Sequence, residues 1–175
     1  MVTGYPAAGK STFARELAGR LQVSCFNKDT VKEILGDGFG AEGGLVYDKG
    51  SAVTFALMLH VAERILQVGG ACIIEGNFWP AENERITELT AKYGECLTFN
   101  FTADPDVAGR RYAERDAERH WVHKKAGDAA QVRDYCLRMK DAALPKGRVV
   151  HVDATDFAMV DYEGLYDAAR GFVEG

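Results

Sequence analysis

The feature that most constrains this chain is a glycine-rich segment close to its start. Residues 4–11 read GYPAAGKS and match the phosphate-binding pattern G-x-x-x-x-G-K-[ST] in full. Glycines in this pattern let consecutive backbone N–H groups surround phosphate oxygens, and the helix that follows directs its positive end toward them. The segment therefore predicts a strand, a turn and a helix in succession, with a nucleoside triphosphate bound at the turn.

The side chains of this segment have separate predicted roles. Lys10 should reach the β- and γ-phosphates, and the Ser11 hydroxyl should bind Mg²⁺. Thr12, in the first turn of the helix, is placed to contact the phosphate nearest the nucleoside. The residues predicted to bind the nucleotide through this segment are Gly4, Ala7, Ala8, Gly9, Lys10, Ser11 and Thr12.

Length and composition limit what surrounds this site. With 175 residues, 47% of them apolar, the chain is predicted to form one domain over residues 1–175. Its four cysteines include no C-x-x-C pair and three lie in apolar runs, which favours buried thiols in a reducing compartment, the cytoplasm. No apolar run approaches the roughly 20 residues of a membrane helix. The net charge of −5 argues against broad duplex binding, although a local basic groove could hold a short strand.

Apolar runs and turn residues divide the chain into alternating strands and helices. Strands are expected at residues 1–3, 23–26, 71–75, 97–101 and 148–152, the first of them short for a strand in the middle of a sheet. Helices are expected at residues 10–21, 31–35, 49–68, 80–93, 105–119, 129–144 and 162–173, with a mobile loop at 36–44. This alternation predicts an α/β fold of three layers, in which helices cover both faces of a five-stranded parallel sheet. Ligands bind such sheets at the carboxyl ends of the strands.

Charged and amide side chains gather where the predicted strands end. Asp29 follows the second strand, and Glu75 ends the third with Asn77 beside it. The helix after the fourth strand carries an arginine at every fourth position from 111 to 119. A kinase needs a carboxylate that accepts the proton of the attacking hydroxyl, a carboxylate near the metal, and cations for the transferring phosphoryl group. The sequence places candidates for all three at one edge of the sheet.

This combination resembles the small P-loop kinases of the polynucleotide kinase and zeta-toxin-like group, over nearly the whole chain. Residues 27–30, NKDT, look like the Asn-Arg-Asp-Asp stretch of phage polynucleotide 5′-hydroxyl kinase, in which the first aspartate is the general base. Residues 75–77, EGN, are similar to an Asp-Thr-Asn stretch after strand three. Residues 119–123, RHWVH, look like the Arg-His-Pro-Gly-His signature of related kinases, and residues 152–156 are similar to a stretch beside the adenine.

The resemblance implies a role for each matching residue. Asp29 would be the catalytic base, and Lys32 would take the place of an acceptor-side arginine. Glu75, which stands where the family has aspartate, would bind Mg²⁺ together with Ser11. A short helical lid is expected at about residues 110–128. The other implied residues are Asn77 and Arg85 at the acceptor, Arg111 and Arg115 in catalysis with Lys10, and Arg119 at the nucleotide.

Structural roles remain open for several of these side chains. Asp29 could act only as a helix cap, while Glu75 and Asn77 could simply end a strand and form a turn. The arginines could lie on a solvated helix face beside neighbouring acidic residues. Histidines at 120 and 123, without cysteine partners, are poor evidence for zinc.

The expected function is that of an ATP- and Mg²⁺-dependent kinase that transfers the γ-phosphoryl group to a hydroxyl of a small molecule or nucleoside-like acceptor. A GTPase is disfavoured because Asp29 directly follows Asn27-Lys28, which leaves the guanine-reading pattern N-K-x-D incomplete. Two alternatives stay open: a polynucleotide 5′-hydroxyl kinase, and a nucleotide-binding regulatory module with little turnover.

Overall fold

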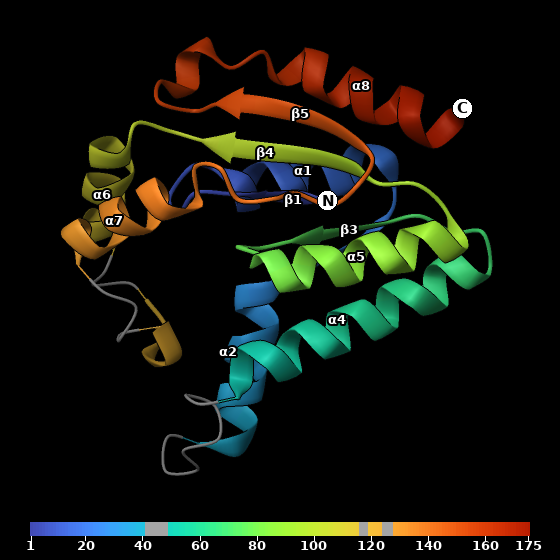
Figure 1. The fold of residues 1–175 in the computed structure, drawn as a ribbon, viewed down its shortest axis with the longest axis horizontal. Helices are drawn as coiled ribbons and strands as arrows, with labels where there is room; N and C mark the ends of the chain where they lie inside the picture. Colours follow the sequence, from blue (N-terminus) through green and yellow to red (C-terminus); the bar gives the residue numbers. More distant parts are fainter. Residues whose placement is uncertain (41–48, 116–118, 124–127) are drawn as a thin grey trace.

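The protein is built on a five-stranded parallel sheet, seen in a computed structural model that describes residues 1–40, 49–115, 119–123 and 128–175 (Figure 1). The strands lie side by side in the order β2-β3-β1-β4-β5. They span Val2–Gly4 (β1), Ser24–Asn27 (β2), Cys72–Glu75 (β3), Leu97–Thr102 (β4) and Arg148–Asp153 (β5). The short β1 is the central strand, so the predicted sheet and its central first strand are both confirmed.

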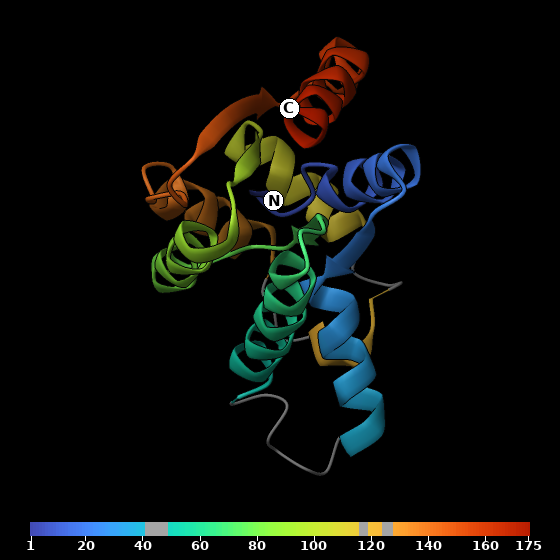
Figure 2. The same cartoon turned by 90° about the vertical axis from the view of Figure 1, so that its right-hand side faces the viewer.

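Helices cover both faces of this sheet (Figures 1 and 2). They span Lys10–Leu21 (α1), Lys28–Phe39 (α2), Gly50–Gln67 (α4), Pro80–Tyr93 (α5), Pro105–Glu114 (α6), Ala129–Met139 (α7) and Tyr162–Glu174 (α8). Two 3₁₀ helices cover Trp121–His123 (η3) and Phe157–Met159 (η4). α6 and α7 pack against each other at one end of the sheet, while α2 and α4 extend from its lower edge (Figure 1). The three-layer α/β prediction is therefore confirmed.

The core has two parts because neighbouring strand residues point to opposite faces of the sheet. Ile73 belongs to a cluster with α1, α6, α7 and α8, in which Phe13 packs between Phe99, Phe101 and the stacked ring of Tyr166. The next residue along β3 belongs to a second cluster, formed with α4 and α5. Continuous apolar strands of this kind are typical of a parallel sheet covered on both sides.

Helix boundaries differ from the prediction at both ends of α2 and at the ends of α6 and α7. α2 continues through two glycines to Phe39, so the predicted loop at 36–44 starts later, and its residues 41–48 lie outside the described part of the chain. α6 ends at Glu114, where the N–H of Arg115 turns back to the carbonyl of Tyr112. α7 ends at Met139, five residues before the predicted end at Leu144.

The long helix α4 is buried on one face only, although its sequence is densely apolar. Phe55 and Ala62 are buried against the sheet, but Val53 and Leu57 are 45% and 44% exposed. α4 belongs to an outer layer, so only one of its faces packs on α5 and β3. Among the described residues, no helix combines the length and the apolar character needed to cross a bilayer.

Candidate active site

The phosphate-binding loop connects β1 to α1 through backbone conformations that other residues rarely adopt. Gly4 and Gly9 have φ angles of 123° and 84°, and Ala7 is left-handed at 57°. A Cβ atom at Gly4 would lie 1.9 Å from the carbonyl oxygen of Phe101, so the loop can start there only with glycine. The N–H of Tyr5 then bonds to that carbonyl at 2.8 Å, which fixes the loop against β4.

Lys10, the first residue of α1, is buried where the loop ends. Its Nζ atom donates a hydrogen bond to the carbonyl oxygen of Tyr5 at 2.5 Å. Burial lowers the pKa of Lys10, and the nearby carboxylates of Glu75 and Asp29 oppose that shift. A buried cation is stabilised by contact with an anion, and binding the phosphates of a nucleotide is the role predicted for this lysine.

Glu75 and Ser11 are brought together by one asparagine. Asn27 and Glu75 are paired residues at the carboxyl ends of β2 and β3, so their side chains lie side by side. The Nδ2 atom of Asn27 donates to the Glu75 carboxylate and to Ser11 Oγ, the latter at 3.4 Å. Burial raises the pKa of Glu75, with a further contribution from the like charge of Asp29. The two predicted Mg²⁺ ligands are therefore neighbours.

Asn27, and not Asp29 or Thr30, caps α2. Its Oδ1 atom accepts a hydrogen bond from the backbone N–H of Thr30 at 2.8 Å. The capping role that could have accounted for Asp29 therefore belongs to another residue. Asp29 lies in the first turn of α2, with its side chain exposed to a polar cavity.

The three predicted arginines are not equivalent. Arg111 is directed away from the cavity: its guanidinium donates to the carbonyls of Ala154 and Thr155 at 2.7 and 2.8 Å and stacks on the Phe157 ring. Arg115 lines the cavity as the C-cap of α6. Because α6 ends early, the predicted single stripe of arginines on one helix face was wrong.

Arg119 reaches the cavity from the segment that follows α6. Its Cζ atom lies 3.6 Å from the centre of the Tyr112 ring, which holds the side chain in place. One of its terminal nitrogens, Nη1, is buried and has no hydrogen-bond partner among the residues that the structure describes. A buried guanidinium nitrogen of this kind is suited to an anionic ligand.

Residues 119–123 are docked on α2 by two histidines. Nε2 of His120 donates to the Asp37 carboxylate at 2.9 Å, and Nε2 of His123 donates to Glu33 at 3.1 Å. Gly36 lets Trp121 and Val122 approach the helix, since a Cβ atom there would lie 3.2 and 3.3 Å from those side chains. The predicted lid at 110–128 also includes residues 116–118 and 124–127, which fall outside the described residues.

These groups surround a polar cavity of about 750 Å³ at the carboxyl ends of the strands. The phosphate loop, α2, the end of β3, Arg115 and residues 119–123 contribute much of its lining. Its charged and amide lining residues include Lys10, Asp29, Glu33, Glu75, Asn77, Arg115 and Arg119. Histidines 120 and 123 also line it, but no cluster of three metal-ligating side chains occurs among the described residues.

The remaining side of the cavity was missed from the sequence. It consists of Trp79 at the start of α5 and of Gln131, Tyr135 and Arg138 on α7. The spacing of the α7 residues, four and then three positions, is the one signal that could have placed them on a common helix face.

Two predicted acceptor residues lie elsewhere. Lys32 is on α2 and Arg85 on α5, and neither lines the cavity. The guanidinium of Arg85 is 5.3 Å from the centre of the Phe55 ring, on an exposed part of α5. Asn77 does line the cavity, and its buried Oδ1 atom has no hydrogen-bond partner within the described part of the chain.

A buried ion pair that the sequence did not reveal supports this edge of the sheet. The Nζ atom of Lys28 lies 2.6 and 2.7 Å from the two carboxylate oxygens of Glu82, and 3.3 Å from the carbonyl of Asn77. Glu82 also accepts from the backbone N–H of Trp79 at 2.9 Å. The pair thus links the residue preceding Asp29 to both β3 and the start of α5.

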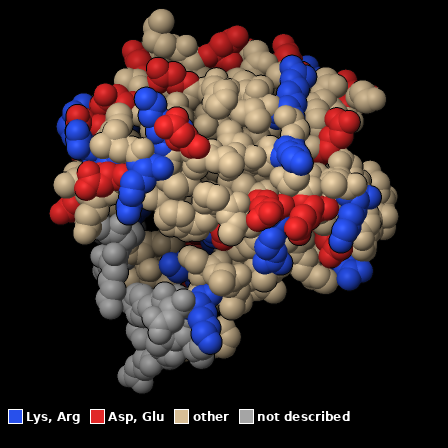
Figure 3. Space-filling view, viewed as in Figure 1, with Lys and Arg blue, Asp and Glu red and all other residues tan. Residues whose placement is uncertain are grey.

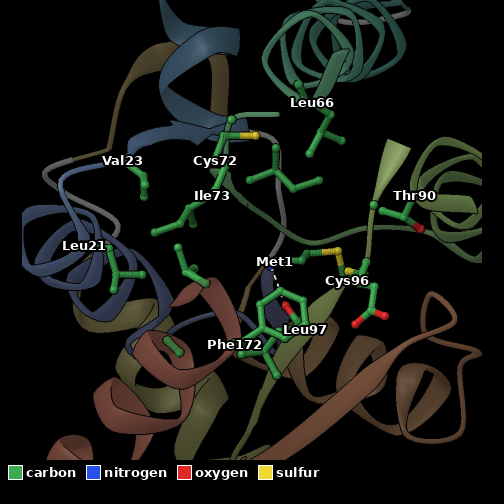
Figure 4. Close-up of a pocket in the computed structure, with 18 of the residues that line it drawn as sticks. Met1, Leu21, Val23, Leu66, Cys72, Ile73, Thr90, Cys96, Leu97 and Phe172 are labelled. Carbon is green, nitrogen blue, oxygen red and sulfur yellow. Dashed lines mark hydrogen bonds between the residues drawn. The ribbon is translucent and has the colours of Figure 1, made fainter. Parts of the chain in front are cut away.

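A second cavity, of about 480 Å³, lies at the opposite ends of the strands and has a different chemistry (Figure 4). Leu21, Leu66, Ile73, Leu97 and Phe172 are among its lining residues (Figure 4). Its apolar character makes it unsuitable for phosphates, so the polar cavity is the candidate active site.

Comparisons with known proteins agree with this geometry. Residues 1–155 match the model of the AAA_33 family, described as an AAA domain, and no curated protein matches the chain. A protein from Chloroflexus aurantiacus J-10-fl, whose assignment as a kinase is itself an inference, is 28% identical with a TM-score of 0.82, covering 99% of this chain and 93% of its own.

Two further solved structures share the fold. Shikimate kinase from Bacteroides thetaiotaomicron is 18% identical with a TM-score of 0.62, covering 99% of this chain and 97% of its own. A gluconokinase from Sinorhizobium meliloti 1021 is 17% identical with a TM-score of 0.58, covering 98% and 91%.

Proposed function

The chain belongs to the AAA_33 family and has the fold of small P-loop kinases, and from this premise we propose that it transfers the γ-phosphoryl group of ATP to a hydroxyl of a small molecule or nucleoside-like acceptor. The observation that carries the proposal is the polar cavity. It joins the phosphate loop to Asp29 on α2 and to Arg115 and Arg119, and its volume of about 750 Å³ suits a small acceptor beside the phosphates.

Different residues of the cavity have different proposed roles in phosphoryl transfer. Asp29 accepts the proton of the acceptor hydroxyl as its oxygen bonds to the γ-phosphorus and the bond to the β-phosphate oxygen breaks. Lys10, Arg115 and Arg119 stabilise the negative charge on the transferring group. This arrangement is suited to transfer because the proposed base and the cations line the same cavity.

Mg²⁺ fits the pair formed by Ser11 and Glu75. Both supply oxygen atoms, and this cation binds through one or two carboxylates together with phosphates and water. When bound, Mg²⁺ would neutralise charge on the β- and γ-phosphates. The raised pKa of Glu75 means that its proton competes with the metal, so binding should strengthen as pH rises.

The base of the nucleotide is expected on the other side of the phosphate loop. There Arg111 stacks on the Phe157 ring at 3.8 Å, and a Cβ atom at Gly9 would lie 3.1 Å from the same ring. We therefore assign Arg111 to the nucleoside side of the site instead of to the phosphoryl group.

A small acceptor is preferred to a polynucleotide on electrostatic grounds. Acidic and basic side chains are interspersed over the end of the molecule that carries α6 and α7 (Figure 3, left). The net charge of −5 adds a general repulsion of long polyanions. The free cysteines, which suit a reducing compartment, support a cytoplasmic location.

Substitution of the proposed base tests the reaction. Asp29→Asn should lower phosphoryl transfer by about 10² to 10⁴-fold while leaving Mg-ATP binding intact. The assay is mass spectrometry of phosphorylated products with Mg-ATP over sugars, nucleosides, shikimate, gluconate and short oligonucleotides, with binding followed by the thermal shift. Saturation at about 100 times the dissociation constant should stabilise the fold by roughly 2.7 kcal/mol.

Asp106→Asn is the matched control, because Asp106 is also the exposed second residue of a helix, α6, but does not line the cavity. It should leave transfer unchanged. Full activity of the Asp29→Asn protein would remove Asp29 as the base, and binding of Mg-ATP without any transfer would favour a regulatory module.

A further inference from the structure

One wall of the polar cavity has no part in the chemistry proposed above. On α7, Gln131, Tyr135 and Arg138 follow each other at intervals of four and three residues, so they lie on one helix face, and all three line the cavity. A neighbouring face of α7 is anchored in the core by Val132 and Cys136, which are 3% and 0% exposed. The cavity wall is therefore held by a rigid element.

An aromatic corner forms the middle of this wall. The rings of Trp79 and Tyr135 meet edge to face, with centres 5.6 Å apart and planes at 83°. Trp79 is 51% exposed although it is one of the largest apolar side chains in the protein. Burial raises the pKa of Tyr135 to about 12, so its hydroxyl stays protonated and can donate a hydrogen bond at neutral pH.

The charge on this wall is positive. Arg138 has no hydrogen bond or ion pair with any residue in the described ranges 1–40, 49–115, 119–123 and 128–175. It lies close enough to Tyr135 to oppose the rise of that phenol's pKa. Glu82, the acidic group that also acts on Tyr135, has both carboxylate oxygens held by Lys28. On this wall, Arg138 is therefore a cation without an acidic partner among the described residues.

A polar atom without a partner lies on the adjacent side. The buried Oδ1 of Asn77 has no hydrogen-bond donor among the described residues, and the neighbouring backbone carbonyl of Asn77 is already bonded to Lys28. An unsatisfied amide oxygen in a binding cavity calls for a donor such as a hydroxyl group.

We propose that Trp79, Tyr135 and Arg138 form the specificity site for an acceptor that carries, besides its hydroxyl groups, a ring and an anionic group. The ring packs on Trp79 and Tyr135, and Arg138 binds a carboxylate or phosphate through paired N–H donors. Asn77 accepts a hydrogen bond from an acceptor hydroxyl and helps to turn the reacting one toward Asp29. The assignment rests on the proposed kinase function and adds the chemical class of its acceptor.

Acceptors that differ only in charge test this class. The probes are 4-(hydroxymethyl)benzoate, its neutral isostere 4-(hydroxymethyl)benzamide, and 4-(hydroxymethyl)phenyl phosphate, each assayed with Mg-ATP by mass spectrometry. The wild-type protein should use at least one anion with a kcat/KM about 10 to 100-fold above that of the amide. Which anion is preferred distinguishes a carboxylate site from a phosphate site.

Arg138→Gln should abolish that preference mainly through KM, with little change for the amide. Arg133→Gln is the matched control, since Arg133 is an exposed arginine of the same helix that pairs with Asp106 and does not line the cavity. A wild-type preference for the amide, an unchanged preference in Arg138→Gln, or no transfer to any probe despite a Mg-ATP thermal shift would each overturn the acceptor class. Absence of the Mg-ATP shift itself would instead contradict the kinase function.

Discussion

At the scale of single residues, the start of the phosphate loop leaves no room for a side chain. Gly4→Ala would place a Cβ atom 1.9 Å from the Phe101 carbonyl at a φ of 123°. We expect a loss of about 3 kcal/mol or more in the free energy of unfolding, measured by urea denaturation. Gly19→Ala, in α1 with no atom near its would-be Cβ, should instead raise stability by about 0.4 to 1 kcal/mol. Equal stability of the two variants would contradict this account.

Burial of the ionised Glu75 carboxylate lowers the stability of the folded protein. Its pKa is raised above the usual 4.5, so the folded protein holds this proton more tightly than the unfolded chain does. The protonated Glu75 therefore favours the folded state at low pH. This contribution to the free energy of unfolding is lost as pH rises above 4.5 and Glu75 ionises, and it is not regained at higher pH.

Glu75→Gln removes this ionisation. We expect the variant to be more stable than the wild type by about 0.5 to 2 kcal/mol at pH 7.5, with the difference disappearing below the usual pKa of a glutamate. It should lose the Mg²⁺-dependent part of the ATP thermal shift. Denaturation curves at several pH values, with Glu84→Gln as an exposed control on α5, measure the effect. A variant less stable than the wild type at pH 7.5 would refute the argument.

At the scale of elements, residues 119–123 can pack on α2 because Gly36 has no side chain. Gly36→Ala would bring a Cβ atom to 3.2 Å from Trp121 and 3.3 Å from Val122. We expect a loss of about 1 to 3 kcal/mol and faster amide exchange over 119–123. Gly38→Ala, in the same helix but in open space, should be neutral or stabilising. Unchanged exchange in Gly36→Ala would show that the contact does not hold the segment.

The Lys28–Glu82 pair connects α2 to α5 in a setting with little solvent, since the side chains are 8% and 14% exposed. Lys28→Met leaves the Glu82 carboxylate without its cation, and we expect a cost of about 3 to 5 kcal/mol. The double variant Lys28→Met/Glu82→Gln should recover part of this loss, because no charge is then left unpaired. Urea denaturation of the four proteins in this cycle gives the coupling energy, and a coupling near zero would exclude a structural role for the pair.

At the scale of the whole molecule, the two cavities lie at opposite ends of the strands and should respond independently. Val23→Ile adds one methylene group to the apolar cavity, and we expect a gain of up to about 0.8 kcal/mol. Mg-ATP binding and phosphoryl transfer should stay unchanged, as measured by thermal shift and product formation. A changed transfer rate would reveal coupling between the two ends of the sheet.

Much of this architecture is predictable because it depends on local patterns. The phosphate loop follows from the glycines at 4 and 9, and the strands follow from short apolar runs bounded by turn residues. Glu75 falls at the predicted edge because parallel strands end together, and its neighbour in the register, Asn27, was part of the motif already noted.

The remainder depends on contacts between distant segments. Neither the early end of α6 nor the stacking of Arg119 on Tyr112 has a local signal. The position of the Arg111 side chain could not be predicted either, because it is fixed by hydrogen bonds to the carbonyls of Ala154 and Thr155, more than 40 residues away in the sequence. The cavity wall on α7 could not be recognised from spacing alone, because many surface helices carry polar residues at such intervals.

Helix α7 contributes different residues to the core and to the polar cavity, so the two sets can change separately. Val132 and Cys136 keep the helix seated in the core, while Gln131, Tyr135 and Arg138 line the polar cavity, where Tyr135 also packs on Trp79. Gln131 and Arg138 are exposed, so substitutions at these two positions should have little effect on the fold or the phosphate loop. Under the proposed function, the cavity face of α7 is the part of the site whose replacement should change the acceptor while the phosphate loop stays intact.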